Sequence, residues 1–156
     1  MVVAGFDPGS LRFGVGLIRQ QGGECEFLHA EEIVLAASDF SRRMGCLWEK
    51  LSAVFLRFPV QSVGMEEGFL GKNVRSMSLL AMVRGVALAA AVSRGVPVKL
   101  YAPRLIKQAL TGNGSASKEQ VNRMVRRLLH FPAGDRLGLD ASDALAVAFC
   151  HARYAK

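Results

Sequence analysis

Four carboxylates, Asp7, Glu66, Asp140 and Asp143, stand where short apolar segments end or where a helix is expected to begin. Acids gathered in one place repel one another unless a cation or a proton lies between them. No Cys or His metal-binding spacing occurs in the chain, and ligands that offer only oxygen suit hard cations such as Mg²⁺ or Mn²⁺. Two such ions about 3.5–4 Å apart can clamp the attacking and leaving oxygens of a phosphoryl group. The acids therefore predict a metal site that hydrolyses a phosphodiester.

Each acid also has a purely structural explanation. Asp7 opens an Asp-Pro-Gly sequence, which commonly forms a turn. Asp140 and Asp143 are three residues apart at an expected helix start, where Asp often caps the helix and acids suit the first turn. Glu66 can be a solvated acid at a strand end, and we interpret the adjacent Glu67 in this way. The metal-site interpretation requires a fold that brings the four acids together.

The segments between the acids predict a mixed α/β domain. Apolar runs bounded by turn residues predict strands over 2–6, 11–19, 24–35, 60–65 and 96–101. Helical spacing predicts helices over 41–58, 74–94, 103–110, 117–130 and 140–153. Three strands joined by tight turns, followed by alternating helix and strand, give a mixed five-stranded sheet flanked by helices. The strands that end at Asp7 and Glu66 can then be neighbours, with the last helix as a third wall.

Several residues mark the ends and contacts of the helices. Ser38, Asp39 or Ser41 can cap the first helix, and Ser117 with Gln120 fits a capping box. The helix over 74–94 is rich in Ala and Leu and contains Gly85. A glycine inside a helix indicates that another element packs closely on it. That element belongs either to the same monomer or to a second copy across a dimer interface.

The charge of the chain is unevenly distributed. The 156 residues carry a net charge of +7. Residues 1–67 have a net charge of −3, whereas residues 68–134 contain eleven basic residues and one acid, a net charge of +10. A local excess of this size favours a polyanionic partner such as nucleic acid.

Size, hydropathy and cysteine usage predict one cytoplasmic domain over residues 1–156. The chain is long enough to bury its own core. Its longest apolar run, 79–92, has 14 residues and contains Arg84, so we expect no membrane-spanning helix. The N-terminus has no basic leader and predicts no signal peptide. Cys25, Cys46 and Cys150 are odd in number and far apart, which is typical of reduced thiols.

Four segments of the chain together resemble one family. VVAGFDPG, VGMEEGF, PRLIKQALTGNGSASKEQVNRMV and LDASDALAVA occur in the order and spacing of RuvC, the bacterial Holliday-junction resolvase family. The resemblance covers nearly the whole chain and implies a ribonuclease H-like fold, which agrees with the element order above. It also implies a homodimer that binds four-way DNA and acts in recombination and repair. Two symmetric nicks would leave 5′-phosphate and 3′-hydroxyl ends, and RuvA and RuvB, the branch-migration proteins, would be further partners.

The resemblance assigns roles to individual residues. It implies that Asp7, Glu66, Asp140 and Asp143 bind two ions, Mg²⁺ or Mn²⁺, in each active site. Glu66 is preferred to Glu67 because the acid of the family lies three residues before a Phe, here Phe69.

Other residues match positions that touch DNA in the family. Lys107 and Lys118 correspond to lysines that act in catalysis and bind DNA, where they can offset the charge that develops on the phosphate. Phe69 would reach among the bases at the junction centre, and Lys72 and Arg75 would approach phosphates from the same loop. The alternative for Phe69 is a side chain folded back onto the core.

Three other classes of protein share part of this pattern. A sugar or acetate kinase fold also opens with strand, acid and Gly-containing turn, but it needs a second phosphate loop and a longer chain. A junction-binding module without catalysis would have the same fold, although the presence of all four acids argues against it. A related resolvase family with a minimal domain should lack the basic stretch from Arg104 to Arg127.

Overall fold

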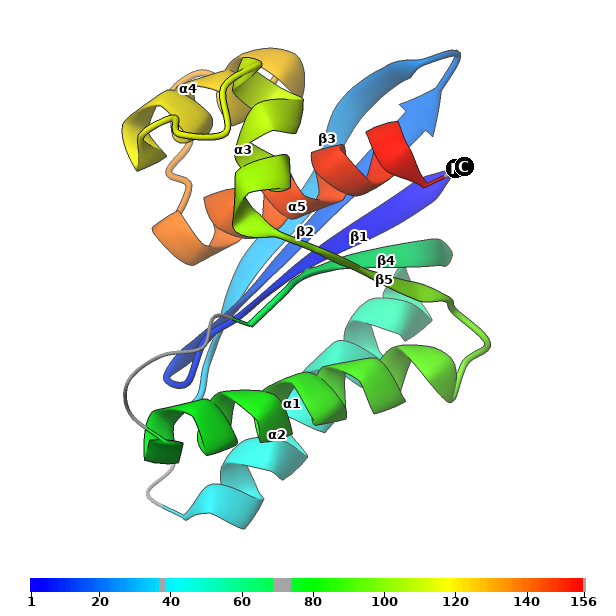
Figure 1. The fold of residues 1–156 in the computed structure, drawn as a ribbon. Coiled ribbons are helices and arrows are strands. Elements are labelled where there is room, and N and C mark those ends of the chain that lie inside the picture. The colour runs from blue at the N-terminus through cyan, green and yellow to red at the C-terminus, as the bar shows by residue number, and fades with distance from the viewer. Residues whose placement is uncertain (37–38, 69–73, 156) are drawn as a thin grey trace.

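A mixed five-stranded sheet with helices on both faces forms the domain (Figure 1). The computed structural model describes residues 1–36, 39–68 and 74–155. Strands β1 (Val2–Pro8), β2 (Arg12–Gln21) and β3 (Glu24–Val34) form an antiparallel meander. Strands β4 (Val60–Glu66) and β5 (Val98–Tyr101) continue the sheet in parallel with β1, in the order β3-β2-β1-β4-β5.

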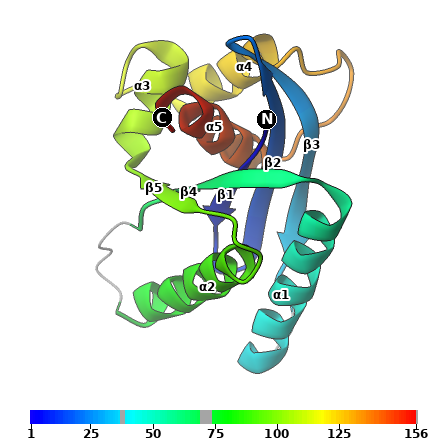
Figure 2. The same cartoon turned by 90° about the vertical axis from the view of Figure 1, so that its right-hand side faces the viewer.

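The helices lie in two layers, and an apolar core separates each layer from the sheet. Helices α1 (Phe40–Arg57) and α2 (Val74–Val92) cover one face, while α3 (Pro103–Thr111), α4 (Lys118–Leu128) and α5 (Leu139–Tyr154) cover the other (Figures 1 and 2). The first core includes Phe6, Phe13, Leu47 and Leu51. The second includes Ile18, Ile106, Val125 and Leu145. Every predicted strand and helix is therefore present, and the predicted mixed sheet is confirmed.

The predicted helix signals are confirmed at two helix starts. The carboxylate of Asp39 accepts a hydrogen bond from Arg42 N at 3.0 Å and caps α1. Ser117 and Gln120 form the expected capping box at the start of α4. Helix α2 ends at Val92, and Gly95 lies in the turn that follows it. The φ angle of Gly95 is positive, at 71°, a conformation that glycine adopts readily.

Glycines on the central strands allow α5 to approach the sheet closely. A Cβ at Gly16 would lie 2.5 Å from Leu145 N. Gly14 is the ladder partner of Asp7, and a Cβ there would overlap the backbone oxygen of Asp140. Without side chains at these positions, the backbone of α5 lies directly on β2. The start of α5 is consequently held beside the end of β1.

Helix α2 buries one face and exposes another that is also apolar. The buried residues are Val83, Ala87, Ala90 and Ala91. The exposed residues Ser78, Ala81, Met82, Gly85, Leu88, Ala89 and Val92 recur every three or four positions along the helix. A Cβ added to Gly85 would meet no atom of the described residues within 4 Å. Packing within the described part of the monomer therefore does not explain this glycine.

The length of α2 agrees with the predicted helix over 74–94 to within two residues. At 19 residues it is long and apolar enough, by length and composition alone, to cross a membrane. The expectation of no such helix rested on the apolar run 79–92, whereas α2 begins five residues before that run, at Val74. In the structure Arg84 lies within the helix and folds against the end of β4, where it bonds Glu66.

Candidate active site

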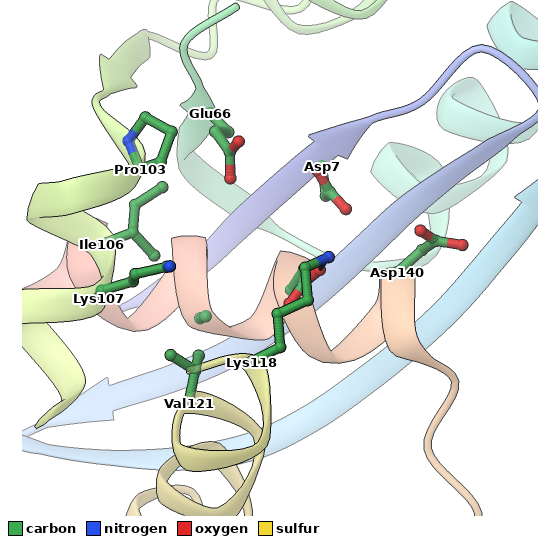
Figure 3. A pocket seen from close by; sticks show the side chains of 10 residues that line it. Asp7, Glu66, Pro103, Ile106, Lys107, Lys118, Val121 and Asp140 are labelled. Carbon is green, nitrogen blue, oxygen red and sulfur yellow. Dashed lines mark hydrogen bonds and ion pairs between the residues drawn. The ribbon is translucent and has the colours of Figure 1, made fainter. Parts of the chain in front are cut away.

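The structure brings the four acids to one pocket at the carboxyl ends of β1 and β4. Asp7, Glu66, Asp140 and Asp143 line this pocket together with Lys107 and Lys118 (Figure 3). Asp7 and Glu66 come from parallel neighbours, because Phe6 of β1 pairs with Met65 of β4 one residue earlier. Carboxyl ends of neighbouring strands are the usual position of ligand sites in open α/β sheets.

Helix α5 supplies the other two acids, and neither caps it. Gly138 is the N-cap residue and makes no side-chain hydrogen bond. Asp140 lies in the first turn, and Asp143 lies one turn further along. Neither acid is therefore the N-cap, whereas Asp140 does occupy the first turn, where an acid suits the helix. Asp143 is also the only residue from 141 to 152 that is not buried, and it lines the pocket.

A residue that the sequence did not single out, Glu32 of β3, holds the start of α5. Its Oε1 accepts a hydrogen bond from Asp140 N at 3.1 Å, and its Oε2 lies 3.3 Å from Arg12 Nη1. Gly138 leaves room for this carboxylate, because a Cβ there would overlap Glu32. Glu32, on β3, thus accepts a hydrogen bond from one of the N–H groups in the first turn of α5 that have no partner within the helix. No local pattern marks it, since its partner lies 108 residues away.

Burial and crowding raise the pKa values of three of the acids. The pKa of Asp7 rises from 3.8 to about 7, mainly through burial and then through the charges of Glu66 and Asp143. Burial and Asp143 also raise the pKa of Glu66, although Arg84, Lys118 and Lys107 oppose the shift. The pKa of Asp140 rises through burial and through the neighbouring Glu32. Such a group of acids favours bound protons or bound cations.

The lysines supply positive charge to this pocket. Lys118, the first residue of α4, places its ammonium 3.2 Å from Asp143 Oδ2. Asp143 raises the pKa of Lys118, so the lysine stays charged, yet its side chain is 73% exposed. Lys107 enters from α3, to the left of Lys118 in Figure 3. Both lysines approach the acids from helices that cover the same face of the sheet.

The donor set fits hard divalent cations in type and charge. All four acids offer carboxylate oxygens. The raised pKa values of Asp7, Glu66 and Asp140 indicate that these three acids lack sufficient positive charge nearby. Within residues 1–36, 39–68 and 74–155, however, no three Asp, Glu, His or Cys side chains are already arranged to hold one ion. Lys118 forms an ion pair with one of these acids, Asp143, at 3.2 Å.

Three predicted DNA-binding positions lie in or near the segment between β4 and α2. Phe69 and Lys72 lie outside the described residues. Arg75 is the second residue of α2, and its side chain is exposed.

Comparison with known proteins decides the family. A family model described as Crossover junction endodeoxyribonuclease RuvC matches residues 3–151. The chain belongs to the RuvC family. A Crossover junction endodeoxyribonuclease RuvC from Tolumonas auensis is 41% identical over 150 residues, which cover 96% of this chain and 86% of the relative. This membership confirms the resemblance and sets aside the kinase and minimal-resolvase alternatives.

Solved RuvC structures confirm the ribonuclease H-like fold. Thermus thermophilus RuvC has a TM-score of 0.87 and 36% identity, and the match covers 99% of this chain and 95% of that one. A second structure shows T. thermophilus RuvC in complex with Holliday junction substrate, with a TM-score of 0.88, 34% identity and the same coverage.

Proposed function

We propose that this RuvC chain resolves Holliday junctions in recombination and repair by two symmetric nicks. The observation that carries the proposal is the pocket where four carboxylates, three of them with raised pKa values, face two lysines. The T. thermophilus relative in complex with Holliday junction substrate supports the choice of DNA. We place the reaction in the cytoplasm, with RuvA and RuvB as further partners, on the basis of the family alone.

Asp7, Glu66, Asp140 and Asp143 would hold two Mg²⁺ or Mn²⁺ ions. Bound ions of this kind lower the pKa of a water molecule and stabilise the charge on the departing 3′ oxygen. The side chains of Asp7 and Glu66 approach from the strands, and Lys107 and Lys118 approach from helices across the pocket. The lysines would face the scissile phosphate and offset its developing charge. The products would carry 5′-phosphate and 3′-hydroxyl ends.

Two grooves share residues with the acidic pocket, and both contain basic side chains beside acids. One groove is lined by Arg104, Lys107, Gly114 and Ser115, among other residues. The other includes Lys118, Arg123 and Arg126. A DNA backbone could follow these grooves across the acids, and Phe69, Lys72 and Arg75 would also contact the junction. Affinity should then fall steeply with rising salt, because each neutralised phosphate releases counterions.

The exposed stripe of α2 supports a homodimer. Ala81, Gly85 and Ala89 are small and recur every four residues on the exposed face. Small residues let two helix backbones approach closely, and the flanking Met82, Leu88 and Val92 provide apolar surface to bury. Gly85 has no neighbour among the described residues of its own chain, so a second copy of α2 would account for it.

Gly85→Leu should convert the dimer into a monomer. A large side chain at the point of closest approach separates the two helices, and overpacking of this kind commonly costs about 1–3 kcal/mol or more. Analytical ultracentrifugation across a concentration series measures the dissociation constant directly. We expect it to rise at least tenfold and paired nicks to become single nicks.

Gly45→Leu provides the matched control. Gly45 is an exposed glycine in α1, and an added Cβ there also meets no described atom within 4 Å. This variant should remain dimeric. If Gly85→Leu stays as dimeric as Gly45→Leu, the interface lies elsewhere on the molecule.

The function itself is tested with a labelled synthetic four-way junction beside a linear duplex of the same sequence. Incubation in Mg²⁺, Mn²⁺ or EDTA separates metal-dependent cutting from binding. We expect symmetric nicks that ligase can reseal, in the junction alone, and no cutting in EDTA. Tight junction binding without cutting in either metal would leave a junction-binding module in place of a nuclease.

A further inference from the structure

Arg84 joins the apolar helix α2 to the strand end that carries Glu66. Its guanidinium Nη2 donates a hydrogen bond to the backbone oxygen of Glu66 at 2.7 Å. The bond reaches the main chain at the point where β4 ends, so it fixes the base of the Glu66 side chain and leaves its carboxylate free. Glu66 lines the catalytic pocket, whereas Arg84 does not.

The contact is closely packed as well as hydrogen-bonded. Arg84 Nη1 and Cζ lie where a side chain at Gly68 would begin, and a Cβ there would be only 2.6 Å from Cζ. Gly68 therefore gives the guanidinium access to the strand end. No hydrogen-bond partner for the buried Nε of Arg84 occurs among the described residues. Burial also lowers the pKa of Arg84, which the neighbouring Glu66 partly opposes.

A partly buried charge of this kind is costly in an otherwise apolar helix. Desolvation of a guanidinium destabilises the fold unless its hydrogen bonds repay the loss. Solvation would be available elsewhere, because much of α2 is exposed. The side chain nevertheless turns toward β4, which indicates a use for the contact beyond covering the core.

The next residue, Gly85, lies on the exposed stripe of α2. Arg84 therefore faces the end of β4, while the next residue of the helix, Gly85, faces the surface assigned above to the dimer. A shift of α2 would carry Arg84 with it, and the end of β4 would follow through the hydrogen bond.

We propose that Arg84 is a positioning residue that fixes Glu66 relative to α2 and so ties the dimer face to the active site. This inference rests on the proposed function, since it gives Glu66 a ligand role. Misplacement of a reacting group by about 1 Å can cost about a hundredfold in rate. Loss of the contact should therefore affect metal binding and turnover while junction binding stays intact.

Three variants separate position from charge. Arg84→Met removes the hydrogen bond and the charge, Arg84→Lys keeps the charge and one donor, and Gly68→Ala keeps Arg84 but displaces it. We expect Arg84→Met and Gly68→Ala each to lower kcat at saturating Mg²⁺ about tenfold to a hundredfold. Arg84→Lys should recover part of the rate. For the two Arg84 variants the junction Kd in EDTA should change less than about twofold, because Arg84 lines neither DNA groove. Gly68 lines one of these grooves, so Gly68→Ala is judged by its Mn²⁺ affinity and by the double-mutant cycle below.

A double-mutant cycle then tests whether Gly68 acts through Arg84. When Arg84 is present, Gly68→Ala displaces its guanidinium. In the Arg84→Met background no guanidinium remains to be displaced. The double variant should therefore be no slower than Arg84→Met alone, and the non-additivity reports the direct contact. Independent effects that multiply would contradict the proposal.

Mn²⁺ binding, followed by electron paramagnetic resonance without DNA, gives a readout independent of cleavage. Its Kd should rise about tenfold in Arg84→Met and Gly68→Ala if Glu66 is misplaced. Arg94→Met is the matched control, because Arg94 lies just after α2 and bonds the backbone oxygen of Ala90, away from β4. It should bind Mn²⁺ and cut junctions as the wild type does.

The outcomes distinguish this inference from the function on which it rests. A wild type that does not cut junctions would overturn the proposed function. A wild type that cuts, together with Arg84 variants that cut and bind Mn²⁺ equally well, would overturn the role of Arg84 alone. Thermal unfolding and sedimentation show whether each variant remains folded and dimeric, and Gly68→Ala tests the contact if Arg84→Met is unstable.

Discussion

Asp7→Asn should lower junction cleavage by at least about a thousandfold, since carboxylate-bound ions supply several kcal/mol of transition-state stabilisation. Asn keeps the size of the side chain but loses the negative charge that a divalent cation needs. Asp7 is also the central acid of the pocket, because its pKa responds to all three of the others. Single-turnover cleavage in saturating Mg²⁺ measures the loss. Junction binding in EDTA should be retained or improved, because one charge that repels phosphate is gone.

The same variant should stabilise the metal-free protein. The pKa of Asp7 is raised from 3.8 to about 7 in the fold. Between these values the folded state binds more protons than the unfolded chain, so the free energy of unfolding falls as the pH rises. Asn does not suffer this loss. The free energy of unfolding of Asp7→Asn should therefore equal that of the wild type near pH 4 and exceed it above pH 7. The full gain should be about 1–3 kcal/mol after allowance for partial exposure.

Urea unfolding in EDTA across pH 5 to 8 measures this gain. Asp135→Asn is the control, because Asp135 is exposed in the loop before α5 and does not line the pocket. A gain that is equal at all pH values, or shared by Asp135→Asn, would contradict the account of Asp7. Addition of Mg²⁺ should reduce the difference, because the ion compensates the charge in the wild type only.

The sequence allowed the fold to be predicted because its signals are local. Alternation, helical spacing and the capping box of Ser117 and Gln120 each depend on residues within a few positions. The acids could be singled out for the same reason, since each lies at a predicted strand end or helix start. The order of the predicted strands and helices then indicated that the four acids would lie close together. Gly14 completes it, because a side chain there would push the start of α5 away from Asp7.

The residues that support the acids could not be found in this way. Glu32 and Asp140 are 108 residues apart, and Arg84 reaches the backbone of Glu66 from another layer. Only the assembled fold shows such pairs. A weak signal existed for Arg84, since a charge inside an apolar helix needs a partner, but the sequence does not show which one. Gly85 differs, because the sequence left open whether a second copy or the same monomer packs on it, and an added Cβ there would meet no described atom within 4 Å.

Lys118→Met should change turnover and metal affinity in opposite directions. Lys118 pairs with Asp143 at 3.2 Å, and its positive charge also acts on Asp7 and Glu66. An ammonium that compensates the acids competes with divalent cations for them. Its removal should therefore lower the Mg²⁺ concentration needed for half-maximal activity several-fold. The rate at saturating Mg²⁺ should nevertheless fall about a hundredfold, the loss typical of one preorganised donor at a developing charge.

Stability gives little information about this lysine, because the side chain is exposed and surface ion pairs contribute little. The informative experiment is a Mg²⁺ titration of single-turnover cleavage for the wild type, Lys118→Met and Lys99→Met. Lys99 bonds the backbone oxygen of Tyr154, at the end of α5 remote from Asp140, so its variant removes one positive charge without touching the acids. If Lys118→Met needed more Mg²⁺ than the wild type, Lys118 would assemble the acids for the ions. If Lys118→Met needed less Mg²⁺ than the wild type but cut more slowly at saturation, Lys118 would act on the phosphate during the reaction.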